Sequence, residues 1–279
     1  MVNEIVWFVT GASKGLGLSL VNQLLAAGHS VAATSRQEDE LIRAVGPRSA
    51  NFLPLQVDLA NEASVALAIQ KAHTTFSRID VVVNNAGYGI GGSIEELTDQ
   101  ETRASFDVNV FGMLNVIRQV MPYLRAQQSG HIINISSIAG IAGNTGWAVY
   151  AATKFAVVGL SDVLAQDVNS FGINVTVVAP GAFRTSFLTP DSLMLAKHPI
   201  DAYAGVRASH AKYLTMDGAQ AGDPEKAAAA MIQVASQPNP PLYLLLGSDA
   251  YQRAMNKLDL LNNAFTRQEA LTTSTDFTN

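Results

Sequence analysis

Short apolar runs alternate with segments of helical periodicity along most of this sequence, and that alternation leaves few folds open. Apolar runs predict strands, separated by helices, at residues 5–10, 30–35, 52–57, 79–83, 131–136, 173–178 and 242–246. Such alternation predicts a parallel sheet with helices on both faces. The run Val81-Val82-Val83 supports it, because a strand buried on both faces loses the polar alternation of an exposed one. We therefore expect a single α/β domain with a doubly wound parallel sheet of about seven strands.

Composition narrows the class of protein further. A chain of 279 residues that is 48% hydrophobic can bury one sizeable core, and its net charge of −5 argues against nucleic acid, which requires a basic surface. Glu4 stands where a signal peptide needs basic residues, and no apolar run approaches the ~18 residues of a membrane span. Because there is no cysteine, there can be no disulfide or thiolate metal site. We expect a cytoplasmic protein without a metal, a membrane span or a nucleic-acid partner.

A glycine-rich turn follows the first strand. Gly11, Gly15 and Gly17 precede a segment in which apolar residues such as Leu18 and Val21 recur at helical spacing. Glycines let the backbone approach a pyrophosphate closely, and the free N–H groups of a helix N-terminus stabilise its charge. We interpret this turn as a nucleotide site in preference to an ordinary connection.

Asparagines occur at two further positions of interest, after the strand at residues 79–83 and inside the helix that follows it. Asn84 and Asn85 directly follow the strand at residues 79–83, where open α/β sheets bind ligands, so we favour a role beside a cofactor over simple turn formation. Farther on, Thr98 and Glu101 have the spacing of a capping box, which predicts a helix over about residues 99–127. Asn109 lies inside this helix and either faces solvent or points inward.

The stretch from Ser137 to Lys154 resembles a catalytic centre in its residue types. Tyr150 and Lys154 are four residues apart, so on a helix they share one face with Cβ atoms roughly 5–6 Å apart. A desolvated lysine beside a phenol lowers its pKa and makes it a usable acid or base. Ser137 ends the strand at residues 131–136, at the same edge of the sheet. The end of this strand and the helix that carries Tyr150 should therefore converge.

The rest of the chain is less regular. Residues 183–216 are expected to form a lid over the ligand edge or a peripheral helical hairpin that packs on the core, and the two interpretations are compatible. Asp223 and Pro224 should begin another helix. We expect residues 1–250 to form the catalytic domain, followed in residues 251–279 by a short helix to about residue 263 and a flexible tail from residue 271.

These motifs occur together in one order: Thr10-Gly-Ala-Ser-Lys-Gly-Leu-Gly17, Asp58, Asn84-Asn-Ala-Gly87, Asn109, Ser137, Tyr150-x-x-x-Lys154 and Pro180-Gly181. In that combination the chain closely resembles the classical short-chain dehydrogenase/reductases over about residues 5–248, which implies a Rossmann-type fold. The resemblance implies that Tyr150 is the proton donor and acceptor, and that Ser137 orients the substrate oxygen. It further implies that Lys154 holds the ribose and lowers the tyrosine pKa, and that Asn109 anchors a water of the proton relay.

The same resemblance assigns a set of cofactor-binding residues that follow the ends of the strands. Asp58 would meet the adenine, Asn85 to Gly87 would line the cofactor, and Thr185 would meet the nicotinamide carboxamide. The full expected set is Gly11, Ser13, Lys14, Gly15, Leu16, Gly17, Ser35, Arg36, Asp58, Leu59, Asn85, Ala86, Gly87, Tyr150, Lys154, Pro180, Gly181 and Thr185.

The residues after the second strand indicate which nicotinamide cofactor is used. An NAD site needs an acid there to accept from the ribose, whereas a 2′-phosphate needs cations. Ser35 occupies the place of the acid, and Arg36 can pair with a phosphate, with Lys14 reaching it from the other side. We therefore expect NADP(H). The alternative is that Glu38 or Asp39 holds the ribose of NAD.

The expected substrate is an apolar ketone or secondary alcohol. The walls of its binding pocket would come from Trp147, Phe183, Phe187, Leu193, Met194 and Leu195. The alternative is a carboxylated or phosphorylated substrate, whose anion Arg184, Lys197 and His198 would bind. The family resemblance and the long helices near residues 99–127 and 147–171 also predict a homodimer or homotetramer.

Two interpretations from other classes stay open. A catalytically silent NADP-binding regulator could use the same fold, because a fold does not fix function. A sugar-nucleotide epimerase or dehydratase also resembles this chain at Tyr-x-x-x-Lys. The intact set of Asn109, Ser137, Tyr150 and Lys154 argues against the first, and the glycine spacing with no large C-terminal substrate domain argues against the second.

Overall fold

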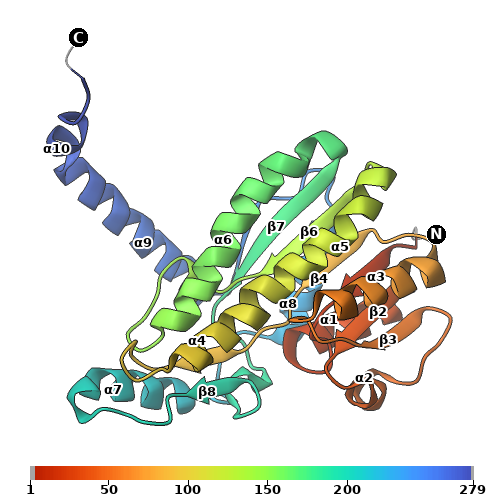
Figure 1. Cartoon of the computed structure of the whole chain (residues 1–279), viewed down its shortest axis with the longest axis horizontal. Coiled ribbons are helices and arrows are strands. Elements are labelled where there is room, and N and C mark those ends of the chain that lie inside the picture. Colours follow the sequence, from red (N-terminus) through yellow and green to blue (C-terminus); the bar gives the residue numbers. More distant parts are fainter. Residues whose placement is uncertain (1–3, 278–279) are drawn as a thin grey trace.

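Seven parallel strands form the central sheet in the order β3-β2-β1-β4-β6-β7-β9, in a computed structural model that describes residues 4–277 (Figure 1). The strands are β1 (Val6–Val9), β2 (Ser30–Ser35), β3 (Phe52–Gln56), β4 (Val81–Asn84), β6 (Gly130–Ile135), β7 (Ile173–Pro180) and β9 (Tyr243–Leu246). The strand order reverses between β1 and β4, and such a switch point opens a crevice at the carboxyl ends of the strands. The expected doubly wound sheet is confirmed.

Helices cover both faces of the sheet (Figure 1). One face carries α3 (Glu62–Phe76), α5 (Gly112–Gln127) and α6 (Ala148–Val168), and the other carries α1 (Gly15–Ala26), α2 (Glu38–Val45) and α8 (Pro224–Ala235). Two apolar clusters fill the layers, for example Ile69 and Leu124 on the first face and Leu24 and Met231 on the second. Burying each such side chain contributes roughly 1.5–3 kcal/mol, so the layers hold the sheet rigid under the crevice.

The helix predicted over residues 99–127 is present but is interrupted by a π-helical segment. It runs as α4 (Asp99–Phe106), η1 (Asp107–Phe111) and α5. The predicted capping box is confirmed, because the Glu101 backbone N–H donates to the Thr98 hydroxyl at 3.2 Å and the Thr98 N–H donates to the Glu101 carboxylate at 3.0 Å. The π turn contains Asn109, which is buried. Asn109 therefore faces inward, the second of the two predicted possibilities.

Residues 183–216 form neither a helical hairpin nor an irregular loop. They contain η4 (Ser186–Leu188), β8 (Leu193–Leu195), η5 (Asp201–Tyr203) and α7 (Ala204–Leu214), and β8 pairs in parallel with β5 (Gly89–Gly91). Buried Glu96 ties this segment down, because its carboxylate accepts from the Ile200 N–H at 2.8 Å and from Arg207 at 2.7 Å. The N–H groups of Ile200 and Ser93, with Arg207, lower the pKa of Glu96 to about 2.

The C-terminal helices extend farther than the sequence predicts. Helix α9 (Ser248–Arg267) projects from the body of the molecule and is followed by α10 (Glu269–Thr273) (Figure 1). The predicted end of the helix at about residue 263 was wrong, and residues 271–273 of the predicted flexible tail belong to α10. Residues 274–277 are not helical, residues 278–279 lie outside the described part, and the flexibility of the tail stays a prediction. Asn262 and Asn263 have low helix propensity, but Ala264 and Arg267 have high propensity and carry the helix past them.

Within residues 4–277, helix α6 is the one segment whose length and composition bear on membranes. The span Ala148–Phe171, with a mean hydropathy of 1.4, is long and apolar enough by those two criteria to cross a bilayer, which the sequence analysis did not anticipate. The core helix of a globular protein passes the same test, and α6 packs on β7 and carries buried Lys154. We therefore assign α6 to the core.

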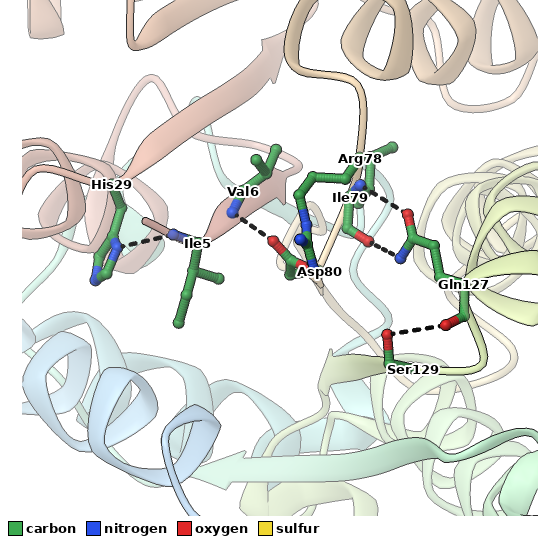
Figure 2. A network of polar contacts seen from close by, with 8 residues as sticks. All are labelled: Ile5, Val6, His29, Arg78, Ile79, Asp80, Gln127 and Ser129. Carbon is green, nitrogen blue, oxygen red and sulfur yellow. Dashed lines mark hydrogen bonds and ion pairs between the residues drawn. The ribbon is translucent and has the colours of Figure 1, made fainter. Parts of the chain in front are cut away.

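A polar network ties the amino ends of the strands together (Figure 2). The Asp80 carboxylate accepts from the Val6 N–H at 2.9 Å and pairs with Arg78 at 2.5 Å. The Gln127 side chain accepts from the Ile79 N–H at 3.3 Å and donates to the Ile79 carbonyl at 2.8 Å. These contacts cap β1 and β4 at the edge of the sheet opposite the crevice, so their role is stability.

We predict that Asp80→Ala lowers the free energy of unfolding by about 1–3 kcal/mol, because the Val6 N–H loses a charged acceptor. Urea denaturation measures this loss. The control is Arg103→Ala, whose ion pair with Asp99 is exposed on both sides and should leave the denaturation midpoint near that of the parent. Equal midpoints for the Asp80 variant and the parent would contradict this role.

Candidate active site

One large cavity runs along the carboxyl edge of the sheet. Its wall includes nearly all of the residues predicted to bind a cofactor: Gly11, Ser13, Lys14, Gly15, Leu16, Ser35, Arg36, Asp58, Leu59, Asn85, Ala86, Gly87, Tyr150, Lys154, Pro180, Gly181 and Thr185. Ser137 also lines it. Of the predicted site residues, all of which the structure describes, Gly17 and Asn109 do not line it. These two residues lie behind the wall, and their predicted roles stay predictions.

The glycines of the first turn are required by close packing. Gly11 has a φ of +64°, and a Cβ there would lie 2.7 Å from the Ala86 Cα. A Cβ on Gly17 would lie 2.5 Å from the amide nitrogen of Asn85. That amide donates to the Thr10 and Gly11 carbonyls at 3.0 and 2.8 Å. Asn85 thus joins the loops after β1 and β4 into one rigid cradle.

A serine pair and a carboxylate lie where β2 ends. The Ser35 hydroxyl is 3.4 Å from the Ser13 hydroxyl, and both are 3.4 Å from the Glu40 carboxylate. Glu40 and Arg36 both line the cavity. Glu38 and Asp39 were predicted from the sequence as the alternative acids here, and Glu40 was not. Its spacing of five residues from Ser35, in the first turn of the following helix, is the signal that could have found it.

Lys14 lies on another side of the cavity from the one expected. Its ammonium donates to the Asp191 carbonyl at 3.4 Å, in the segment that precedes β8. Thr185 borders the glycine turn as well, since a Cβ on Gly15 would lie 3.5 Å from the Thr185 side chain. The glycine turn and the segment at residues 183–216 therefore approach each other across the cavity, and the predicted contact of Lys14 with a phosphate stays a prediction.

Tyr150 is buried among aromatic rings on the first turn of α6. The centroid of its ring lies 5.7 Å from that of Phe187 and 6.3 Å from that of Trp147. Ser137 follows β6 and accepts from the Ala139 N–H at 3.1 Å, which fixes its hydroxyl beside the phenol. The convergence of β6 and α6 predicted from the sequence is present.

Burial dominates the acid and base properties of this pair. It raises the pKa of Tyr150 to about 12, and the Ser137 hydroxyl offsets only part of that rise. Burial also lowers the pKa of Lys154 to about 8. The Lys154 ammonium lies 5.9 Å from the centre of the Tyr150 ring and donates to the Ile135 carbonyl at 3.0 Å. The lowered tyrosine pKa that was expected from this pair is therefore not present in the protein alone.

Asn109 holds the loop after β4 in place from behind the cavity wall. Its side-chain oxygen accepts from the Tyr88 N–H at 3.0 Å, and its nitrogen donates to the Tyr88 carbonyl at 3.0 Å and to Thr153 at 3.3 Å. A Cβ on Gly87 would lie 3.0 Å from this side chain and 3.5 Å from the Lys154 ammonium. The predicted water-anchoring role of Asn109 stays a prediction.

The substrate end of the cavity has an apolar wall. Five of the six residues predicted for it line the cavity, namely Trp147, Phe183, Phe187, Leu193 and Met194. Leu195 follows Leu193 and Met194 on β8 but does not line the cavity, and it packs against the apolar cluster that contains Trp147 and Tyr150. Arg184, Lys197 and His198 also lie outside the lining among the described residues, so the cations considered from the sequence are not part of this wall.

Comparison with known proteins agrees with this arrangement. The family model described as short chain dehydrogenase matches residues 5–194. The oxidoreductase BOA17 of Botryotinia fuckeliana is 36% identical over 259 residues, which are 92% of this chain and 94% of that protein. The 3-ketodihydrosphingosine reductase of Bacteroides thetaiotaomicron is 36% identical over 239 residues, 86% of each chain.

Solved structures give the same result for the fold. A short-chain dehydrogenase from Streptomyces avermitilis superimposes with a TM-score of 0.90 at 34% identity, covering 98% of this chain and 100% of that one. ElxO with NADP bound has a TM-score of 0.74 at 25% identity, covering 89% and 99%. A 3-ketoacyl-(acyl-carrier-protein) reductase from Brucella melitensis with NADH, at 24% identity, covers 86% and 96% with a TM-score of 0.73 and shares the fold.

We predict that the buried Lys154 makes stability rise with pH. The unfolded state keeps its proton to about pH 10.4, whereas the folded state loses it above about pH 8, so the unfolded state binds more protons in this window. Relative to Lys154→Met, the wild type should gain roughly 1–2 kcal/mol between pH 8 and pH 10. Denaturation of both proteins across this range measures it, and parallel curves would show that the ammonium is well solvated.

Proposed function

The chain belongs to the short-chain dehydrogenase/reductase family of oxidoreductases, and from this we propose that it transfers a hydride between NADP(H) and a ketone or secondary alcohol. The observation that carries the proposal is the convergence of Ser137 and Tyr150 on one side of a cavity whose other side is the glycine cradle. Two hydroxyl groups at one point are suited to bind a carbonyl oxygen.

The residues present fit a nicotinamide cofactor. Gly11 and Gly17 allow a close backbone approach at the start of α1, where a pyrophosphate is stabilised by free N–H groups. When bound, the nicotinamide gives or takes the hydride. In the proposal, Lys154 holds the ribose, Thr185 meets the carboxamide and Asp58 meets the adenine, as the family resemblance implies.

Tyr150 would give its proton to the substrate oxygen during reduction and take it back during oxidation. Ser137 donates a second hydrogen bond to that oxygen and stabilises its developing negative charge. Because burial holds the Tyr150 pKa at about 12, the phenol is the protonated form available for reduction at neutral pH. The apolar wall with Phe187 and Met194 excludes water and favours an apolar substrate.

The wider organisation of the protein follows from the same proposal. Residues 1–250 would be the catalytic domain with a lid at about residues 183–216, and residues 251–279 its C-terminal extension. Phe111 on the η1 segment with Phe155 and Val163 on α6 are large apolar residues that are about half exposed. They support a homodimer or homotetramer, which we place in the cytoplasm.

We predict that Tyr150→Phe lowers kcat roughly 10²–10⁴-fold while leaving NADPH affinity nearly unchanged, because the ring still packs on Phe187 and Trp147. Ser137→Ala should lose roughly 10²–10³-fold. NADPH oxidation over a panel of ketones measures turnover, and NADPH fluorescence measures affinity. Tyr203→Phe is the control, since Tyr203 bonds Glu95 outside the cavity lining. If the wild type reduced none of the ketones, the result would favour a catalytically silent NADP-binding regulator. A kcat of Tyr150→Phe within tenfold of the wild-type value would contradict proton transfer by Tyr150.

We predict that Arg36→Asp lowers the ratio of kcat/KM for NADPH to that for NADH roughly 100-fold, chiefly through KM, because a 2′-phosphate loses its cation. Glu40→Gln should act in the opposite direction, since a carboxylate beside Ser35 repels that phosphate. Arg48→Asp, outside the cavity lining, is the control. An unchanged ratio in the Arg36 variant would count against NADP(H).

A further inference from the structure

The C-terminal helix α9 brings a cation to the substrate end of the cavity. Arg253 of α9 lines the cavity, as do Asn144 and Tyr213. The first turns of α9 are fixed there, because Ala250 and Ala254 pack on Ile138 in the turn that follows Ser137. Packing therefore fixes the helical turn that carries Arg253, and the Tyr213 ring, which contacts Asn144, lies 5.2 Å from the ring of Trp147 in the apolar wall.

The contacts of Arg253 leave its charge uncompensated. Its Nη2 donates to the Ala142 carbonyl, and with the Asn144 amide oxygen turned toward the donors Nη2 also lies 3.2 Å from that oxygen. Both partners are neutral. Within residues 4–277, no carboxylate oxygen lies within 4.0 Å of the guanidinium, and its Nε and Nη1 make no hydrogen bond. A half-buried guanidinium stays charged at every relevant pH, so these donors favour an anion.

The surroundings reinforce this positive charge. Lys212 on α7 lines the same cavity and also has no carboxylate within 4.0 Å in the described part of the chain. Asp249 is the acid nearest along α9, but its carboxylate accepts from the Ala182 N–H at 2.9 Å and does not pair with Arg253. Asp249 lines the cavity as well, so this end combines an apolar wall with two cations that have no carboxylate partner and one carboxylate that is held by a backbone N–H.

Resting on the proposed function, we propose that the physiological substrate is an amphipathic ketone or alcohol that carries an anionic oxygen group, carboxylate or phosphate, and that Arg253 binds this group. The apolar part would contact Phe187 and Met194, between the reacting carbonyl and the anion. The same charge disfavours a substrate with an amino group, because an ammonium would be repelled by Arg253 and Lys212.

The test uses four aliphatic ketones of equal chain length that end in a carboxylate, a phosphate monoester, a methyl ester or a primary amine. The wild type should have its highest kcat/KM for one of the two anions and its lowest for the amine. Arg253→Gln should lower kcat/KM for the preferred anion roughly 10- to 100-fold, mainly through KM, and change that for the ester less than about threefold. Arg253→Lys should retain most of the anion preference, and Lys257→Gln, one turn farther on α9 and outside the lining, should retain all of it.

The outcomes separate this inference from the proposed function. An equal loss for anion and ester in Arg253→Gln would show that Arg253 only supports the loop after β6 and would overturn the inference, as would a wild type that prefers the ester or the amine. If no ketone is reduced, the proposed function fails, and quenching of Trp147 fluorescence still reports binding at the substrate end. An Arg253-dependent preference for an anion in that binding assay would uphold the inference, and equal binding of all four compounds would overturn it.

Discussion

The site depends on two side-chain-to-backbone hydrogen bonds between the end of β6 and helix α6. The Ser136 hydroxyl donates to the Lys154 carbonyl at 2.8 Å, and the Lys154 ammonium donates back to the Ile135 carbonyl at 3.0 Å. Gly140 makes this approach possible, because a Cβ there would lie 2.6 Å from the Lys154 carbonyl oxygen. These contacts set the distance between strand and helix, and with it the relation of Ser137 to Tyr150.

A buried amide chain extends the same constraint across the sheet. The Asn84 side chain donates to Asn134 at 2.8 Å, and Asn134 donates to Ser161 on α6 at 2.9 Å. Buried polar groups are costly unless paired, so such a chain has one satisfied arrangement and fixes the register of β4, β6 and α6. The Asn84 side-chain oxygen has no partner among the described residues. We therefore attribute this chain of buried amides to the positioning of the strand ends, which carry the site, and not to stability.

The parts of the site that follow directly from a strand or a turn were accessible to sequence analysis. Seven strands, the glycine cradle and the positions of Ser137 and Tyr150 follow from local periodicity and spacing, because each depends on neighbours within a few residues. Arg253 and the pairing of β5 with β8 were not accessible, since they depend on contacts about 100 residues apart that leave no local pattern. Glu40 could have been predicted in part, because it is close to Ser35 in sequence and the first turn of α2 places its carboxylate beside the Ser35 hydroxyl.

The packing that positions Tyr150 and Lys154 also sets their protonation. Close contact of α6 with β6 removes water from Tyr150 and Lys154, and desolvation moves both pKa values toward the neutral forms, to about 12 and about 8. The ammonium cannot correct this by moving to the phenol, because the Ile135 carbonyl holds it 5.9 Å from the ring centre. A buried group responds strongly to any charge that enters its surroundings, since little solvent screens it. The acidity of Tyr150 is therefore sensitive to any charge in the cavity beside it, and the hydrogen bonds of Ser136 and Lys154 keep both groups in this desolvated position.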